Sequence, residues 1–159
     1  MGKSGENVRR GGETGMFMNE YSHTIDAKGR MILPAKFREE LGENFILSPG
    51  IDTCLTIYPR ERWEMLLARI QQLSATKLNV RQFRRFLIGG STEMECDRQG
   101  RILIPSHLRA RAKLEKDAKI IGVGDTIEVW NPALLNELQA KESMADIAES
   151  LDIPLGFNM

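Results

Sequence analysis

The chain has 159 residues, of which 42% are hydrophobic and 28% are charged, a composition typical of globular proteins rather than disordered, collagen-like or disulfide-stapled ones. Its 22 basic residues equal its 22 acidic residues, so total charge alone neither predicts nor excludes a nucleic-acid partner. The two cysteines, Cys54 and Cys96, are too few for a disulfide framework and do not form a zinc-binding pair, and no apolar run reaches the about 20 residues of a membrane span.

Residues 1–15 are polar and glycine-rich and show no apolar periodicity. This pattern predicts a disordered leader, a misassigned upstream start or a cloning remnant. The folded part is expected to begin near Met16 or Met18.

Residues 20–62 predict a first β-rich unit. Strand-like residues at 20–25 run into Asp-Ala-Lys-Gly-Arg, and a short helix follows over 34–41, with Gly42 as its C-cap. Two short strands are expected at 45–47 and 55–58. An Asp that accepts its own downstream backbone N–H groups, followed by a Gly that adopts positive φ, is typical of a tight turn. We therefore expect Asp26 and Gly29 to form a hairpin, with Arg30 at the start of the returning strand.

Residues 63–90 predict a helical linker. Trp63, Leu66 and Ile70 recur at helical spacing, and a second helical pattern over 79–88 is expected to end at Gly89-Gly90. These apolar stripes indicate core rather than a cofactor site.

Residues 135–159 predict a C-terminal helix and tail.

Residues 91–134 predict a second β-rich unit that repeats the first. Five residues that define the first copy recur at an offset of 71: Asp26, Gly29, Arg30, Pro34 and Arg38 correspond to Asp97, Gly100, Arg101, Pro105 and Arg109. The apolar positions between them agree at the same offset. The doubled turn is therefore expected to place Arg30 and Arg101 at equivalent sites related by a pseudo-twofold axis. Each guanidinium could fork onto a phosphate or onto guanine.

Charge is unevenly distributed along the neutral chain. Nine basic and three acidic residues lie between Thr76 and Leu114, whereas five acidic residues and one basic residue follow Asn131. Such a division can create a local positive field, or it can reflect a solvated helix face and a solubilising tail. A second alternative concerns the turns themselves, in which each Arg could simply pair with the Asp of its own turn.

The two copies resemble the AbrB/SpoVT swapped-hairpin DNA-binding family, in a form with two tandem repeats, and the resemblance extends from Met16 to about Leu151. It implies an α+β fold in which two βαβ-type repeats interleave their hairpins into one β-barrel with flanking helices. It also implies a cytoplasmic, nucleoid-associated bacterial transcriptional regulator. Its partners would be double-stranded DNA, read at short direct repeats in the promoter of the division and cell-wall gene cluster, its own promoter included, and further copies of itself in a ring.

The same resemblance implies which residues face DNA. The motif arginines fall on Arg30 and Arg101, and the basic residues after each motif proline join them: Lys36, Arg38 and Arg109. To these we add Lys28 and Arg98, the basic residues within the two turns, as predicted DNA-binding residues. The copies are not identical, because Lys28 corresponds to Gln99.

An enzyme and a pure interaction module are the two alternatives to a DNA-binding regulator. Asp26 and Asp97 are better explained by turn chemistry than as paired catalytic carboxylates, and His23 and His107 lack the context of a nucleophile or metal motif. We therefore expect no enzyme activity, no metal and no cofactor. A ring-forming, antitoxin-like interaction module without a specific DNA target would share the fold, so only nucleic-acid binding separates it from a regulator.

Overall fold

The computed structural model describes residues 16–154, and its mixed α+β architecture contains an antiparallel sheet and six helices. The first copy and the helices after it supply these elements: β1 (Glu20–Thr24), β2 (Arg30–Ile32), α1 (Ala35–Leu41), β3 (Phe45–Pro49), β4 (Leu55–Pro59), α2 (Arg60–Gln71) and α3 (Leu78–Gly90). The second copy and the chain after it supply these: β5 (Thr92–Met94), β6 (Arg101–Leu103), α4 (Ser106–Arg111), β7 (Asp117–Gly122), β8 (Ile127–Trp130), α5 (Pro132–Gln139) and α6 (Met144–Ser150).

Strands of the two copies are interleaved within the sheets. The six-stranded sheet has the order β1-β7-β8-β4-β3-β5, so the first strand of each copy pairs with the hairpin of the other copy. The remaining strands, β2 and β6, form a separate two-stranded antiparallel ribbon. Neither copy completes its own sheet, so the two halves fold as one unit.

The strand register relates the copies by a local twofold axis. In the ribbon, Met31 pairs with Ile102, its own equivalent at offset 71. In the middle of the large sheet, Thr56 pairs with Glu128, at an offset of 72. Pairing between equivalent residues at the centre of an antiparallel ladder requires a pseudo-twofold axis there, as the repeat predicted.

The closed β-barrel implied by the resemblance is not found in residues 16–154. β1 and β5 are the free edges of the large sheet, and the hairpin between β1 and β2 contains only one isolated bridge, Ile25 to Met31. The reason is that the backbone N–H of Ile25 donates to the carbonyl of Lys116 in the second copy, 2.7 Å away, so β1 continues along β7 rather than along β2.

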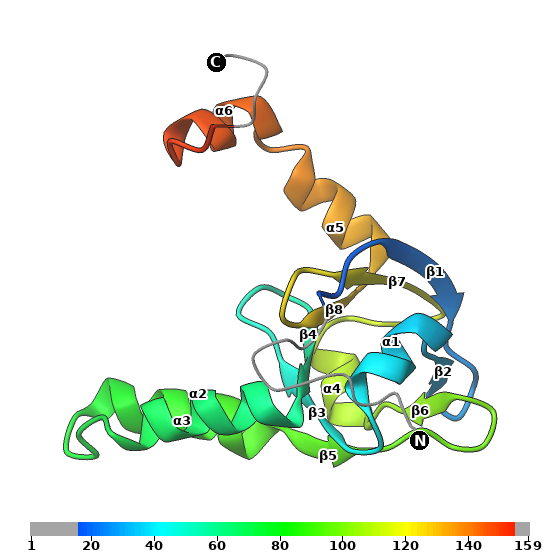
Figure 1. The fold of residues 1–159 in the computed structure, drawn as a ribbon, viewed down its shortest axis with the longest axis horizontal. Coiled ribbons are helices and arrows are strands. Elements are labelled where there is room, and N and C mark those ends of the chain that lie inside the picture. Colours follow the sequence, from blue (N-terminus) through cyan, green and yellow to red (C-terminus); the bar gives the residue numbers. More distant parts are fainter. Residues whose placement is uncertain (1–15, 155–159) are drawn as a thin grey trace, which may run out of the picture.

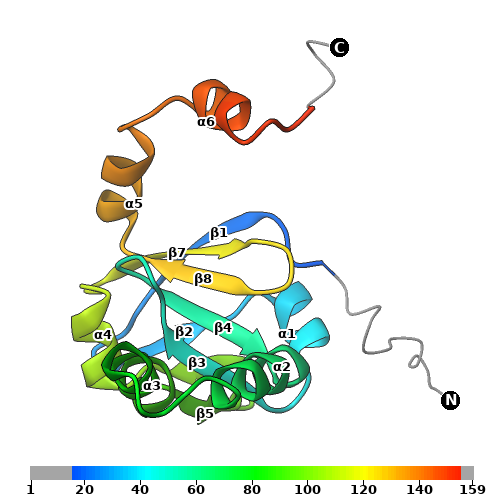
Figure 2. The ribbon, with the colours of Figure 1, turned by 90° about the vertical axis from the view of Figure 1, so that its left-hand side faces the viewer.

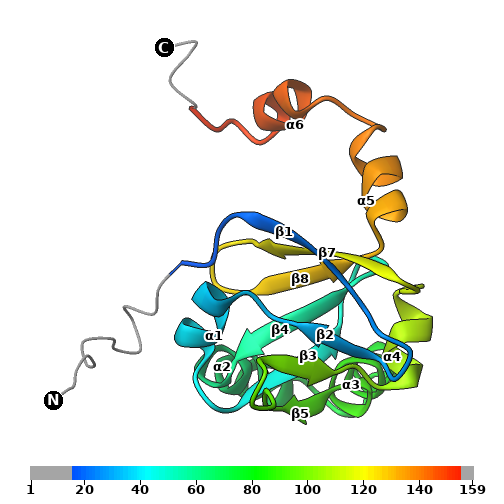
Figure 3. The same ribbon diagram turned by 90° about the vertical axis from the view of Figure 1, so that its right-hand side faces the viewer.

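The main core lies between the ribbon, the large sheet and the two short helices after the ribbon strands. Phe37 of α1 and Leu108 of α4 are buried in it, and Phe37 makes edge-to-face contacts with the rings of Phe17 and Tyr21. The helices α2 and α3 lie side by side against β3 and β4 (Figures 2 and 3) and bury a second cluster that includes Trp63 and Leu87. The predicted apolar stripes of the linker therefore do face the core.

One expectation about the helices is confirmed and one is not. α3 ends at Gly90, so the helix stops at the Gly89-Gly90 pair as predicted. After β8 the chain forms two helices rather than one, α5 and α6, which extend away from the sheets (Figure 1). None of the residues of α6 is buried in this chain.

Candidate nucleic-acid interface

The two Asp-x-x-Gly-Arg turns have the same hydrogen bonds. Oδ1 of Asp26 accepts from the backbone N–H groups of Lys28 (3.0 Å) and Arg30 (2.8 Å), and Oδ2 accepts from Nε of Arg30 (2.7 Å). In the second copy, Asp97 accepts from the backbone of Gln99 and Arg101 (both 2.9 Å) and from Nε of Arg101 (2.8 Å). The turn chemistry predicted from the sequence is therefore confirmed in both copies.

A glycine completes each turn. Gly29 and Gly100 have φ of +93° and +80°, a region that residues with a Cβ rarely adopt. The N–H of Gly29 donates to the carbonyl of Asp26 at 2.9 Å, and that of Gly100 donates to the carbonyl of Asp97 at 3.0 Å. The turn tips, residues 26–28 and 97–99, are exposed.

Each arginine is oriented by its own aspartate, so the local ion pairs considered from the sequence do form. The contact uses the Nε edge of the guanidinium, which carries further N–H donors on its two terminal nitrogens. The side chains retain 33% (Arg30) and 26% (Arg101) of their accessible surface. The pairs thus fix the direction of two partly exposed guanidinium groups.

The backbone N–H of Arg30, followed by its side chain and the backbone of Lys28, lowers the pKa of Asp26 below its ordinary value. The equivalent groups of Arg101 and Gln99 lower the pKa of Asp97. Both carboxylates are therefore ionised at neutral pH.

The ribbon presents both arginines on its outward face. Along each strand the middle residue, Met31 or Ile102, is buried, while its neighbours point outward. Arg30 pairs with Leu103 and Arg101 pairs with Ile32, so the outward face alternates a guanidinium and an apolar side chain. Ile32 and Leu103 are 43% and 56% exposed. These two surface residues were not among the predicted site residues, although the period-two alternation of a strand could have identified them.

The other predicted basic residues fall into two groups. Lys28 and Arg98 are exposed on the turn tips, and Lys36 is exposed on α1. Arg38 on α1 and Arg109 on α4 are half-buried, and their Nε atoms donate to the carbonyls of Leu33 and Ile104, both at 3.0 Å. These last two therefore point inward, toward the turns, and are not freely exposed as the others are.

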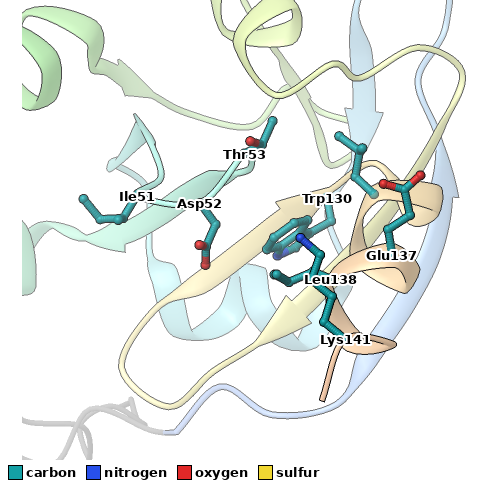
Figure 4. A pocket seen from close by; sticks show the side chains of 8 residues that line it. Ile51, Asp52, Thr53, Trp130, Glu137, Leu138 and Lys141 are labelled. Carbon is teal, nitrogen blue, oxygen red and sulfur yellow. The ribbon is translucent and has the colours of Figure 1, made fainter. Parts of the chain in front are cut away.

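Within residues 16–154, the His, Cys, Asp and Glu side chains do not form a metal site. No group of three or more His, Cys, Asp or Glu side chains that could hold a metal ion occurs there, and none of its helices has the length and apolar character needed to cross a membrane. Cys54 and Cys96 are free thiols. A hollow between the segment 51–53 and α5 is lined by apolar residues together with Asp52, Thr53, Glu137 and Lys141 (Figure 4). The two Asp-x-x-Gly-Arg turns do not contribute to it.

Comparison with known proteins identifies relatives over most of the chain. The family model described as "MraZ protein, putative antitoxin-like" matches residues 16–86 and again residues 87–152. A protein of Thermoanaerobacter sp. (strain X514) named "Transcriptional regulator MraZ" is 50% identical over 139 residues, which cover 86% of this chain and 97% of that protein. Proteins of the same name from Desulfitobacterium hafniense (strain Y51) and Carboxydothermus hydrogenoformans are 49% and 46% identical over 138 residues, with 86% of this chain and 96% of each relative covered.

Proposed function

This chain belongs to the MraZ family, and we propose that it is a DNA-binding transcriptional regulator whose two turns and connecting ribbon meet the duplex. The observation that carries the proposal is the outward ribbon face, on which Arg30 and Arg101 are held by identical ion pairs at equivalent positions. The relatives named as transcriptional regulators agree with it.

The shape of this face suits the major groove. That groove admits a two-stranded β-ribbon, arginine can donate two hydrogen bonds to guanine, and apolar side chains can contact the methyl group of thymine. The alternation of Arg30 and Arg101 with Ile32 and Leu103 supplies both kinds of group. Lys28, Lys36 and Arg98 lie exposed on the turns and on α1 and would contact phosphates, which fix register without reading sequence.

The finer parts of the proposal follow from the resemblance to the AbrB/SpoVT family. The interleaved strands support the interpretation as swapped hairpins, with two copies in one chain taking the place of two subunits. The DNA targets would be short direct repeats in the promoter of the division and cell-wall gene cluster. The protein would act in the cytoplasm on the nucleoid, without a cofactor, and would not be an enzyme.

Self-association into a ring is part of the same proposal. Large apolar side chains remain exposed on α3 and α6, among them Leu78 and Met144. The charges also complement each other, since α3 carries Arg81 and Arg85 while α6 carries Asp146 and Glu149. Leu78 lines one hollow with Phe83 and Phe86 on α3, and a contiguous exposed apolar patch of this kind marks an interaction site. Light scattering at micromolar concentration should report several subunits, and a monomer would contradict the ring.

The second candidate is the antitoxin-like interaction module, which the wording of the family description favours. Fluorescence anisotropy with the DNA upstream of the protein's own gene separates the two. We expect tight binding that falls steeply as salt rises, and a scrambled duplex of the same length should bind more weakly. Equal binding to both duplexes, or none to either, would contradict the regulator and leave the interaction module.

A further inference from the structure

Each turn glycine is covered by an arginine of the other repeat. A methyl group placed on Gly100 would lie 2.7 Å from Cζ of Arg38, and one placed on Gly29 would lie 2.9 Å from Cζ of Arg109. Both distances are shorter than real carbon contacts allow, so the flat guanidinium lies directly against the glycine. Arg38 belongs to the first copy and Gly100 to the second, so this contact joins the two repeats. Arg109 of the second copy makes the equivalent contact with Gly29 of the first.

Hydrogen bonds anchor each arginine in that position. The carbonyl of Leu33 accepts from Nε of Arg38 (3.0 Å), while the N–H of Leu33 donates to the carbonyl of Gly100 (3.0 Å). One residue, Leu33, therefore holds both the arginine and the glycine beneath it. In the equivalent arrangement of the other copy, the carbonyl of Ile104 accepts from Nε of Arg109 (3.0 Å), and the N–H of Ile104 donates to the carbonyl of Gly29 (2.9 Å).

We propose that Arg38 and Arg109 are positioning residues, each of which holds the turn of the opposite repeat and so sets the direction of that repeat's DNA-facing arginine. Gly100 lies directly before Arg101 in the chain, so a shift of the glycine moves the start of β6. The glycine is favoured here because its φ is positive, and a Cβ at this position would in addition push the guanidinium of Arg38 away from the turn.

The consequence for DNA binding rests on the proposed function. Each repeat would depend on the other for its recognition surface, so the two turns could not act as independent modules. This role differs from the direct DNA contact implied for Arg38 and Arg109 by the resemblance. A direct contact and a positioning role make different predictions, both in the free protein and in the salt dependence of binding.

Hydrogen exchange on the free protein provides the first test. Arg38→Ala removes the guanidinium that covers Gly100 together with its anchoring hydrogen bond to Leu33. It should speed amide exchange in the turn at 97–101 by about 3- to 10-fold, the size of effect that one net hydrogen bond has, and should leave the turn at 26–30 near its wild-type rate. Arg109→Ala should do the reverse. Lys36→Ala, which changes an exposed neighbour on the same helix as Arg38, is the matched control and should alter neither turn. Unchanged exchange at the opposite turn in both arginine variants would overturn the proposal.

Salt titration of duplex binding provides the second test, on the same variants. Arg38→Ala should weaken duplex binding and leave the slope of log affinity against log salt concentration at its wild-type value. Lys36→Ala should reduce that slope by about one unit, the value for one phosphate contact. Arg38→Lys guards against misfolding, since it keeps the charge but lacks the planar fork: it should still bind more weakly than wild type. A reduced salt slope in Arg38→Ala, with Arg38→Lys at wild-type affinity, would assign Arg38 to direct contact. If the wild-type protein binds no duplex, the proposed function fails, and the exchange experiment still decides the positioning role.

Discussion

The sharpest mutational prediction concerns the two outward arginines. Arg30→Ala and Arg101→Ala each remove one guanidinium from the ribbon face. A well-formed bidentate contact to guanine is worth about 1–3 kcal/mol, so each single variant should lose roughly 5- to 150-fold in affinity for the cognate duplex. The two side chains are outward-facing and partly exposed, and exposed ion pairs contribute little to folding, so thermal stability should change little.

The double variant tests whether both repeats engage the duplex. If they do, the losses should multiply, because the two arginines lie at equivalent positions without sharing a partner. If only one repeat binds, one single variant should account for the whole loss. Arg69→Ala, an exposed arginine on α2, is the charge-matched control and should keep wild-type affinity in the same anisotropy titration. Wild-type affinity in both Arg30→Ala and Arg101→Ala, with folding intact, would refute the role assigned to this face.

Four further predictions address the ribbon, the core, the turns and a thiol. Ile32→Ser with Leu103→Ser should lower the preference for cognate over scrambled duplex and leave the salt slope unchanged, as measured by anisotropy. Phe37→Ala should destabilise the fold by about 3–5 kcal/mol in urea unfolding, because a ring buried in the main core leaves a cavity; a loss below about 1 kcal/mol would contradict the packing. The pKa of Asp26 is lowered in the folded chain, so its stabilising effect is present above the unfolded pKa of about 3.9 and is lost as pH falls through the lower folded value. Asp26→Asn should therefore lower the thermal midpoint at pH 7, and the difference should vanish in strong acid; a constant difference would contradict the assignment. Burial, with Glu128 and Asp52 adding to it, raises the pKa of Cys54 to about 12, so this thiol should resist alkylation at pH 8 until the protein is unfolded; rapid reaction of the native protein would contradict its burial.

Local features of the fold were predictable because they depend on residues close together in the chain. The Asp26 turn needs only an aspartate, a glycine and the N–H groups between them, and the repeat at offset 71 transfers it to Asp97. The same repeat predicts the pseudo-twofold axis, which the pairing of Met31 with Ile102 confirms. The helices after Pro59 and in the segment before Gly42 were also identified from local signals.

Features that depend on contacts between the repeats were not predictable in the same way. Nothing in the spacing of Arg38 and Gly100 indicates that the first lies on the second, because the contact depends on how β2 meets β6. The course of β1 along β7, which leaves the ribbon separate from the large sheet, depends on a hydrogen bond between Ile25 and Lys116 of the other repeat.

Photo-crosslinking from the turn tips tests the central claim most directly. A short photoreactive group on a cysteine introduced at Ala27 or at Gln99, in a background that lacks Cys96, would sit on an exposed tip of one turn or the other. The same group at Gln71, exposed at the end of α2, is the control. We predict efficient crosslinks to the cognate duplex from both turn positions and few from the control. Crosslinks from position 71 alone, with the turns silent, would contradict the claim that the paired turns and their ribbon bind DNA.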